Sequence, residues 1–279
     1  MTEPASPSRR RLLRGAAAAT ALAATGGALV VSGNRLDVHR VPTPDSPRSD
    51  GSREPLRVAL LTDVHAPHDW FAFDELAAAT RAFDPHVVLV VGDAINRRGD
   101  EQLVRAYGAL PARLAKLAVL GNWEYQGRCD VAALRAEYDS AGVRLLVNES
   151  ATIDHGGELV AILGLDDYLR GRPRLSLLTG LASSASASAP RTLVMAHCPA
   201  LFDTARQLVK APFVALSGHT HGGQIAPFGR ALVTPPGSGA YVKGWYGDAS
   251  QRLYVSRGLG NSDIPFRVGS PPELALLTL

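Results

Sequence analysis

Short, mostly apolar runs of strand length constrain the fold of this chain more than any other feature. They cover residues 56–62, 86–91, 117–120, 192–196 and 213–216. A continuous apolar run without polar alternation is typical of a strand that is covered on both faces. Stretches with helical spacing separate several of these runs, at residues 71–83, at 101–115 with an interruption or restart at Pro111, and, after the capping residue Asp130, up to Ala141. This alternation predicts an α/β fold.

The remaining strands are expected near Leu145, at residues 159–165 and in the Gly/Pro-rich C-terminal part. There, residues 253–256 and 274–279 are short strand candidates that we expect to complete a second sheet. Residues 181–190 are rich in Ala and Ser, which predicts a loop.

The N-terminal segment has the composition of an export signal. Residues 8–14 are basic, and an Ala/Gly-rich apolar stretch follows to about Val31. The pair Arg9-Arg10 followed by Leu12-Leu13 resembles a twin-arginine (Tat) signal. An uncleaved membrane anchor and a basic disordered leader are the alternatives. We therefore expect a signal or anchor over residues 1–31, a Pro-rich linker over 32–55 and one domain over 56–279, in a protein that is exported, periplasmic or extracytoplasmic.

Charge and cysteine content exclude two classes of protein. Residues 1–53 hold eight Arg and four acidic residues, so the net charge of +3 belongs to this segment and the body is nearly neutral. Composition therefore predicts no nucleic-acid partner. The two cysteines, Cys129 and Cys198, cannot form a disulfide framework, although the sequence leaves open whether they pair.

Polar motifs follow five of the apolar runs directly, at the point where each expected strand ends. They are Asp63-Val64-His65, Gly92-Asp93, Gly121-Asn122, His197 and the pair His219/His221. In open α/β sheets, ligands bind beyond the carboxyl ends of the strands, so these side chains should converge. Imidazole and carboxylate groups together suit Mn, Fe, Zn or similar ions. The conjunction of the five motifs predicts a two-metal site, although each motif alone is more often a turn, a cap or a core histidine.

The ordered set of motifs resembles the calcineurin-like metallophosphoesterase superfamily over about residues 56–279. The resemblance rests on Asp63-x-His65, Gly92-Asp93, Gly121-Asn122-x-Glu124, His197 and Gly218-His219-x-His221. The segments Gly222-Gly223-Gln224, 256–260 and Pro272-Glu273 resemble an exported bacterial branch, in which some members carry Tat signals. Enzymes related to that branch cleave phosphodiesters or the pyrophosphate of UDP-2,3-diacylglucosamine.

This resemblance implies a four-layer αββα sandwich of two mixed sheets with a dinuclear metal site at the strand ends. One divalent ion would be held by Asp63, His65, Asp93 and His221. The other would be held by Asp93, Asn122, His197 and His219, with Asp93 bridging. Asp93, Asn122 and His197 are accordingly the expected catalytic residues, and two such metals can activate water and bind the phosphoryl oxygens.

The residue after Asn122 departs from much of the superfamily. Many members have a histidine there that can protonate the leaving oxygen, whereas this chain has Trp123, whose indole supplies no proton. Either the preferred leaving group is already a weak base, such as the phosphate released from a pyrophosphate, or Trp123 only shapes the pocket wall. Asp167 and Arg257 are further candidates for substrate binding, with capping and surface pairing as the alternatives.

The expected function is a metal-dependent hydrolase of a phosphodiester or pyrophosphate in a phosphorylated small molecule or a lipid-linked substrate. A periplasmic nucleotide phosphodiesterase or phosphomonoesterase is the second hypothesis, and a non-catalytic metal-binding domain is the third. The Tat export machinery is an expected partner, and the N-terminus offers a means of membrane association.

Overall fold

The computed structural model describes residues 31–32, 36–43, 54–67, 72–182, 191–262 and 264–279. Residues 1–30 of the expected signal and residues 183–190 of the expected loop lie outside the described residues. No helix in the part that the structure describes is long and apolar enough to cross a membrane.

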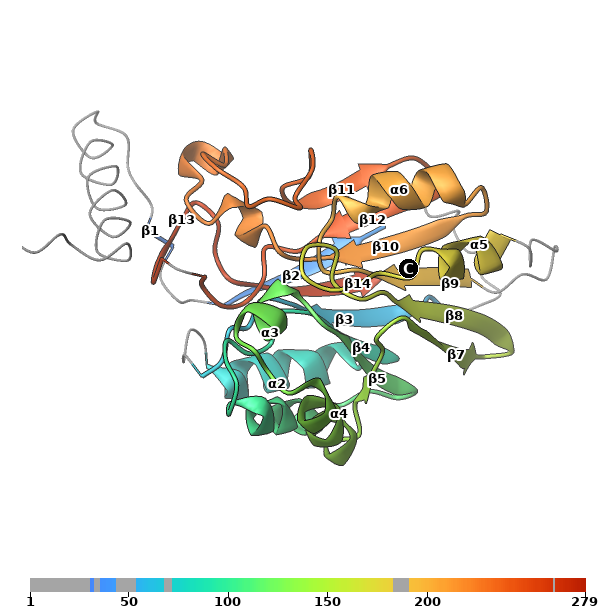
Figure 1. Ribbon diagram of the computed structural model, residues 1–279, viewed down its shortest axis with the longest axis horizontal. Coiled ribbons are helices and arrows are strands. Elements are labelled where there is room, and N and C mark those ends of the chain that lie inside the picture. The colour runs from blue at the N-terminus through green and yellow to red at the C-terminus, as the bar shows by residue number, and fades with distance from the viewer. Residues whose placement is uncertain (1–30, 33–35, 44–53, 68–71, 183–190, 263) are drawn as a thin grey trace, which may run out of the picture.

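Two six-stranded mixed sheets form the centre of the molecule (Figure 1). The first sheet has the order β2 (Asp37–Pro42), β14 (Glu273–Thr278), β3 (Arg57–Leu61), β4 (Val87–Val91), β5 (Ala115–Val119) and β6 (Arg144–Leu145). The second sheet has the order β11 (Gly244–Gly247), β12 (Gln251–Val255), β10 (Phe213–Ser217), β9 (Arg191–Met195), β8 (Glu158–Gly164) and β7 (Glu149–His155). A separate pair joins β1 (Val31–Ser32) to β13 (Arg267–Val268).

Parallel strands occupy the middle of both sheets. In the first sheet β3, β4, β5 and β6 run parallel, and in the second β8, β9, β10 and β12 do. Every residue of β4 is buried, as its continuous apolar sequence predicts. Parallel strands place their carboxyl ends at one edge of each sheet, which positions the residues that follow them.

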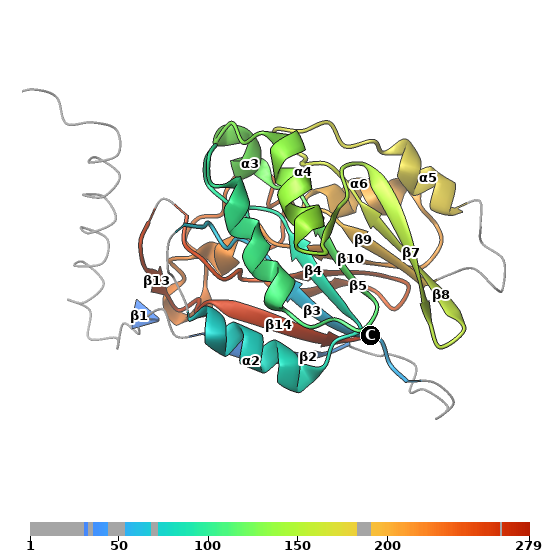
Figure 2. The ribbon, with the colours of Figure 1, turned by 90° about the horizontal axis from the view of Figure 1, so that it is seen from below.

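Helices cover the outer face of each sheet. Figures 1 and 2 show α2 (Phe73–Phe83) and α4 (Val131–Ser140) on the first sheet, and α5 (Ser176–Ala182) and α6 (Leu201–Leu208) on the second. The 3-10 helix η1 (Glu101–Ala109) packs against α4. Three apolar clusters fill the spaces between the four layers. One lies between the first sheet and its helices, one lies between the two sheets, and one lies between the second sheet and its helices. The predicted αββα sandwich is confirmed.

Three expectations from the sequence are wrong in detail. Residues 37–42, assigned to a linker, form β2, which pairs in parallel with β14 through six residue pairs. β14 itself joins the first sheet, although the sequence placed it in the second. Of the helix expected over 101–115, only residues 101–109 are helical, and Ala115 already begins β5.

The sequence hides β2 because it is an edge strand. The three consecutive residues Val38, His39 and Arg40 are exposed, so the strand shows no alternation of buried and exposed side chains there. Pro42, which has no backbone N–H to donate, ends the strand. Its partner lies more than 230 residues further along the chain, so no local pattern shows the pairing.

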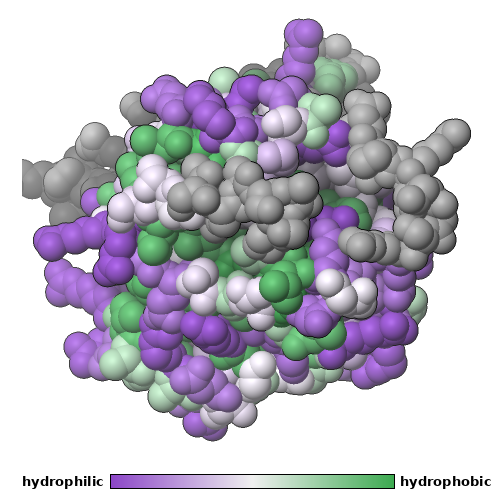
Figure 3. Space-filling model, turned by 90° about the vertical axis from the view of Figure 1, so that its right-hand side faces the viewer, coloured by the Kyte–Doolittle hydropathy of each residue, from purple (hydrophilic) through white to green (hydrophobic). Residues whose placement is uncertain are grey.

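The end of the molecule at which the parallel strands begin is shown in Figure 3. Hydrophilic side chains form most of the rim of this face, with hydrophobic ones between them near the middle.

Cys129 and Cys198 are free thiols in the described structure, so they do not pair.

Candidate metal centre

The polar motifs of both sheets meet beyond the carboxyl ends of the parallel strands. Asp63 follows β3, Asp93 follows β4 and Asn122 follows β5, where it begins the short helix α3 (Asn122–Gln126). From the second sheet, His197 follows β9, and His219 and His221 follow β10. All of these side chains are buried.

These residues form two groups that could each hold a metal ion. Asp63, His65 and His221 make up the first group, and Asp93, His197 and His219 make up the second. Within each group the candidate ligand atoms all lie within 4.8 Å of one another.

Asp93 lies between the two groups. Its Oδ2 atom is 3.1 Å from His197 Nε2 in its own group and 3.8 Å from His65 Nε2 in the other. Asp63 also faces both groups, since its Oδ1 atom is 3.4 Å from His221 Nε2 and 3.8 Å from His197 Nε2. The groups therefore form one continuous constellation.

Hydrogen bonds on the outer side of each ring orient the histidines. His65 Nδ1 lies 2.7 Å from Asn96 Oδ1, His197 Nδ1 lies 2.8 Å from the Val91 carbonyl, and His219 Nε2 lies 2.7 Å from the Pro236 carbonyl. A ring nitrogen next to such an acceptor carries the proton, so the opposite nitrogen presents a lone pair to the constellation. This is how metal-binding histidines are usually held.

Two polar atoms that face the middle of the constellation have no hydrogen-bond partner in the part of the chain that the structure describes, and a bound cation could take that place. His197 Nε2 and Asn122 Oδ1 are buried, and neither has a hydrogen-bond partner among the described residues. His65 Nε2 and His221 Nε2 lie 3.1 Å apart. Buried acceptors without donors are costly, and a divalent ion would satisfy them, so the donor set fits metal binding.

The ionisable groups of the constellation shift one another's pKa values. Burial works against ionisation of Asp93, but the adjacent His197 imidazole outweighs it and lowers the pKa of Asp93 to about 2. Burial, followed by the nearby Arg267 guanidinium, lowers the pKa of His221 well below its ordinary value. A neutral His221 can donate its lone pair to a metal.

The backbone around the constellation is strained. Asp63, His65, Asp93, His219 and His221 all have left-handed backbone conformations, with φ between 51° and 73°. Such conformations are uncommon in residues other than glycine and concentrate at functional sites. The left-handed turns change the direction of the chain at the end of each strand.

Glu124 and Arg267 hold the loops behind the constellation. The buried Glu124 carboxylate accepts hydrogen bonds from the backbone N–H groups of Gly121, Asp93 and Ala94. The fully buried Arg267 guanidinium donates to the carbonyl oxygens of Gly258, Gly260 and His221. Glu124 belongs to the motif recognised in the sequence and lies three residues after Gly121, as in a capping box. No sequence motif pointed to Arg267.

A cavity of about 740 Å³ opens next to the constellation. Asp93, Asn122, His219 and His221 line one side, and Trp123 lies beside them. Much of the remaining wall is apolar and comes from Ile225, Pro227, Leu232, Val233, Pro235, Pro236, Ile264, Phe266 and Val268.

Asp167 and Arg257 do not line this cavity, so the expectation that they bind substrate is not supported. Asp167 is fully buried, and its carboxylate accepts the backbone N–H groups of Leu169 and Arg170. Arg257 forms ion pairs with Glu273 and Asp37. Their roles are capping and pairing, the alternatives that the sequence left open.

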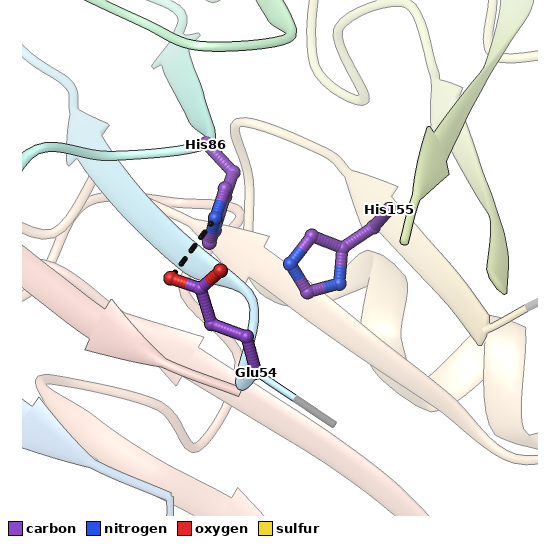
Figure 4. A group of neighbouring side chains, drawn as sticks. All are labelled: Glu54, His86 and His155. Carbon is purple, nitrogen blue, oxygen red and sulfur yellow. Dashed lines mark ion pairs between the residues drawn. The ribbon is translucent and has the colours of Figure 1, made fainter. Parts of the chain in front are cut away.

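A third group of candidate ligands lies at the opposite end of β4 (Figure 4). Glu54, His86 and His155 point toward one another there. However, the Arg57 backbone N–H donates to His86 Nδ1 at 3.0 Å, so the neutral ring carries its proton on Nε2, which faces Glu54 at 3.5 Å. Glu54 also pairs with Arg57. This group is a hydrogen-bonded cluster, because its inner nitrogen offers no lone pair to a metal.

Comparison with known proteins agrees with the geometry. The sequence profile of the calcineurin-like phosphoesterase family matches residues 56–223. The metallophosphoesterase YkuE of Bacillus subtilis is 29% identical, over 98% of this chain and 97% of the relative. The metallophosphoesterase YkoQ of the same organism is also 29% identical, over 86% of this chain and 90% of the relative.

A solved structure with a similar fold is the NAD nucleotidase of Haemophilus influenzae. The TM-score is 0.51 and the sequence identity 13%, with 76% of this chain and 48% of that chain covered. At this identity the likeness shows the fold alone, and this chain spans only about half of the nucleotidase.

Proposed function

Because this chain belongs to the calcineurin-like phosphoesterase family and is a metal-dependent phosphoester hydrolase, we propose that it cleaves a phosphodiester or pyrophosphate bond, in the first place in a lipid-linked substrate. The observation that carries this proposal is the cavity, which joins the buried carboxylate and imidazole groups to a largely apolar wall. A substrate suited to that cavity has a phosphoryl group at one end and an apolar group at the other.

The ligand sets proposed for two divalent ions follow the two groups in the structure. Asp63, His65 and His221 would hold one ion, and His197, His219 and Asn122 would hold the other, with Asp93 available to both. Mn, Fe and Zn are the ions best suited to these donors. When bound, such a pair supplies Lewis acidity and activates water for in-line attack on phosphorus.

The residues of the cavity wall indicate which kind of leaving group the enzyme can release. Among the residues that the structure describes, Arg170 is the one ionisable side chain on this wall apart from the proposed ligands, and it donates hydrogen bonds but cannot act as a general acid. Trp123 stands beside Asn122, and its backbone N–H donates to Asp93 Oδ1 at 2.8 Å. A leaving group that departs as a stable anion, such as the phosphate side of a pyrophosphate, needs no proton.

A nucleotide phosphodiesterase or phosphomonoesterase is the second candidate. The fold shared with a nucleotidase is compatible with it, and Trp123 offers a ring on which a base can stack. In that case Trp123 shapes the wall of the cavity.

We further propose that the chain is exported through the Tat machinery and acts in the periplasm or another extracytoplasmic space. The supporting observation is the sequence of residues 8–31, with its twin arginines and apolar stretch. If this segment stays attached, it associates the enzyme with the membrane.

The test uses the full chain in detergent, because β2 belongs to the first sheet and a truncation at residue 54 would remove it. After metal removal, Mn, Fe(II), Zn, Mg and Ca are added singly. Turnover is measured on bis(p-nitrophenyl) phosphate, a nucleoside monophosphate and a UDP-linked lipid pyrophosphate.

We expect activity that metal restores and that Asp93→Ala abolishes, with the lipid pyrophosphate turned over faster than the nucleotide. Faster turnover of the nucleotide would select the second candidate. Failure to bind metal would contradict the proposed ligand sets.

A further inference from the structure

The mouth of the cavity exposes an unusual concentration of apolar side chains. Two segments, residues 168–174 and 227–233, form what is called here the mouth surface. Phe228 is 80% exposed, Val233 76% and Leu232 54%, and Tyr168 and Leu169 are also exposed. Leu169, Leu232 and Val233 line the cavity as well, so the exposed surface is continuous with its apolar wall. Exposed apolar patches of this kind mark interaction sites.

The charge of the mouth surface has one sign. Arg170, Arg172, Arg174 and Arg230 are exposed, and the two segments contain no Asp or Glu. None of the four guanidinium groups forms an ion pair within the described ranges. From residue 54 onward the chain carries 21 basic and 22 acidic residues, so this local excess departs from a balanced body.

The backbone presents these side chains in fixed positions. Phe228 has φ 54°, a left-handed conformation that is costly for a bulky residue, while its side chain points out of the core. In the other segment, Asp167 caps the turn through Leu169 and Arg170. Tyr125 of α3 ties that turn to the metal centre by donating to Asp166 at 2.6 Å.

We propose that the mouth surface docks on an anionic lipid surface. Exposed aromatic and aliphatic side chains can enter the boundary between headgroups and acyl chains, and arginines among them pair with lipid phosphates. The cavity then opens directly onto the membrane. This inference goes beyond catalysis, because it holds for any substrate and does not involve the N-terminal segment.

A local measurement on the full chain tests this docking and separates it from binding through the N-terminus. Hydrogen exchange of residues 225–236 is followed by mass spectrometry with vesicles of phosphatidylcholine, with or without phosphatidylglycerol. We expect exchange at Phe228 and Val233 to slow by about tenfold on the anionic vesicles and to recover in high salt.

The variant Phe228→Ser/Leu232→Ser/Val233→Ser should lose this protection. The matched control is Leu159→Ser/Leu208→Ser, which removes exposed apolar side chains from β8 and α6 and should keep it. Vesicle binding without protection of residues 225–236 would overturn the proposal. Protection that appears without lipid as the protein concentration rises would instead identify a second copy of the chain as the partner.

Discussion

Asp93 Oδ2 lies 3.1 Å from His197 Nε2, and this contact joins the first sheet to the second at the metal centre. Asp93 follows β4 and His197 follows β9, so each sheet supplies one partner. Both side chains are buried, and His197 Nε2 has no hydrogen-bond partner among the described residues. The relative position of the two sheets therefore decides whether a metal can be held between them.

Asp93→Asn should abolish most activity, because it removes the charge that faces both groups of ligands while keeping the volume of the side chain. We expect kcat/KM to fall by at least about 100-fold and the number of tightly bound metal ions to decrease. Steady-state kinetics and metal analysis of the same sample check this. Asp154→Asn, near the end of β7, is the control and should leave both values unchanged. Full metal content with normal turnover in Asp93→Asn would contradict the bridging role.

Gly121→Ala should damage the centre without replacing any of the proposed ligands. A Cβ atom at residue 121 would clash with Asp93 Oδ1 and lie 2.5 Å from the Asp93 backbone nitrogen, and the rigid backbone cannot move aside cheaply. We expect the free energy of unfolding to fall by about 1–3 kcal/mol and activity to fall with it. Urea unfolding and kinetics are the measurements. Gly180→Ala in α5, where a Cβ meets nothing within 4 Å among the described residues, should be harmless. Equal behaviour of the two variants would be evidence against this steric explanation.

Trp123→His tests the role of the leaving group. If the wild type lacks a proton donor, the new imidazole should raise turnover of alkyl phosphodiesters by about tenfold or more, and that of p-nitrophenyl esters far less. The measurement is the ratio of kcat/KM for the two substrates. Trp123→Phe is the control, since it keeps a ring without adding a donor. An unchanged ratio in Trp123→His would mean that Trp123 only shapes the cavity.

Glu273→Gln should weaken the acid dependence of stability. Although burial opposes ionisation, the His39 hydrogen bond and the Arg257 charge lower the pKa of Glu273 to about 2. A carboxyl whose pKa falls on folding stabilises the protein above its unfolded pKa, and this contribution is lost as the pH drops from about 4.5 to about 2.

The free energy of unfolding of the wild type should therefore exceed that of Glu273→Gln by about 3 kcal/mol at pH 7, and this difference should shrink toward pH 2. Denaturant unfolding at several pH values measures both. Glu158→Gln, on the rim of β8, serves as a control for the loss of a less buried carboxylate. If the difference in the free energy of unfolding between the wild type and Glu273→Gln did not depend on pH, Glu273 would act by packing alone.

The amino-acid pattern was enough to predict the fold class and the set of residues that meet at the metal centre. Continuous apolar runs specify strands buried on both faces, and parallel strands bring their carboxyl ends to one edge. The residues that follow those runs, Asp63, Asp93, Asn122, His197 and the pair His219/His221, therefore had to converge wherever the sheets met. Asp167 and Arg257, which do not line the cavity, could not be told from its lining residues by sequence, because a polar residue after a strand has the same local pattern whether it caps a turn or faces a cavity.

Features that depend on partners far apart in the chain could not be predicted from local patterns and became visible in the folded protein. β2 is an edge strand stabilised by β14, and Arg267 is buried because loops from distant segments supply its acceptors. The left-handed backbone at Asp63, Asp93 and His221 is paid for by packing and hydrogen bonds that surround it, and no local propensity reports such strain. The mouth surface likewise depends on tertiary structure, because residues from both 168–174 and 227–233 line the same cavity although they are far apart in the chain.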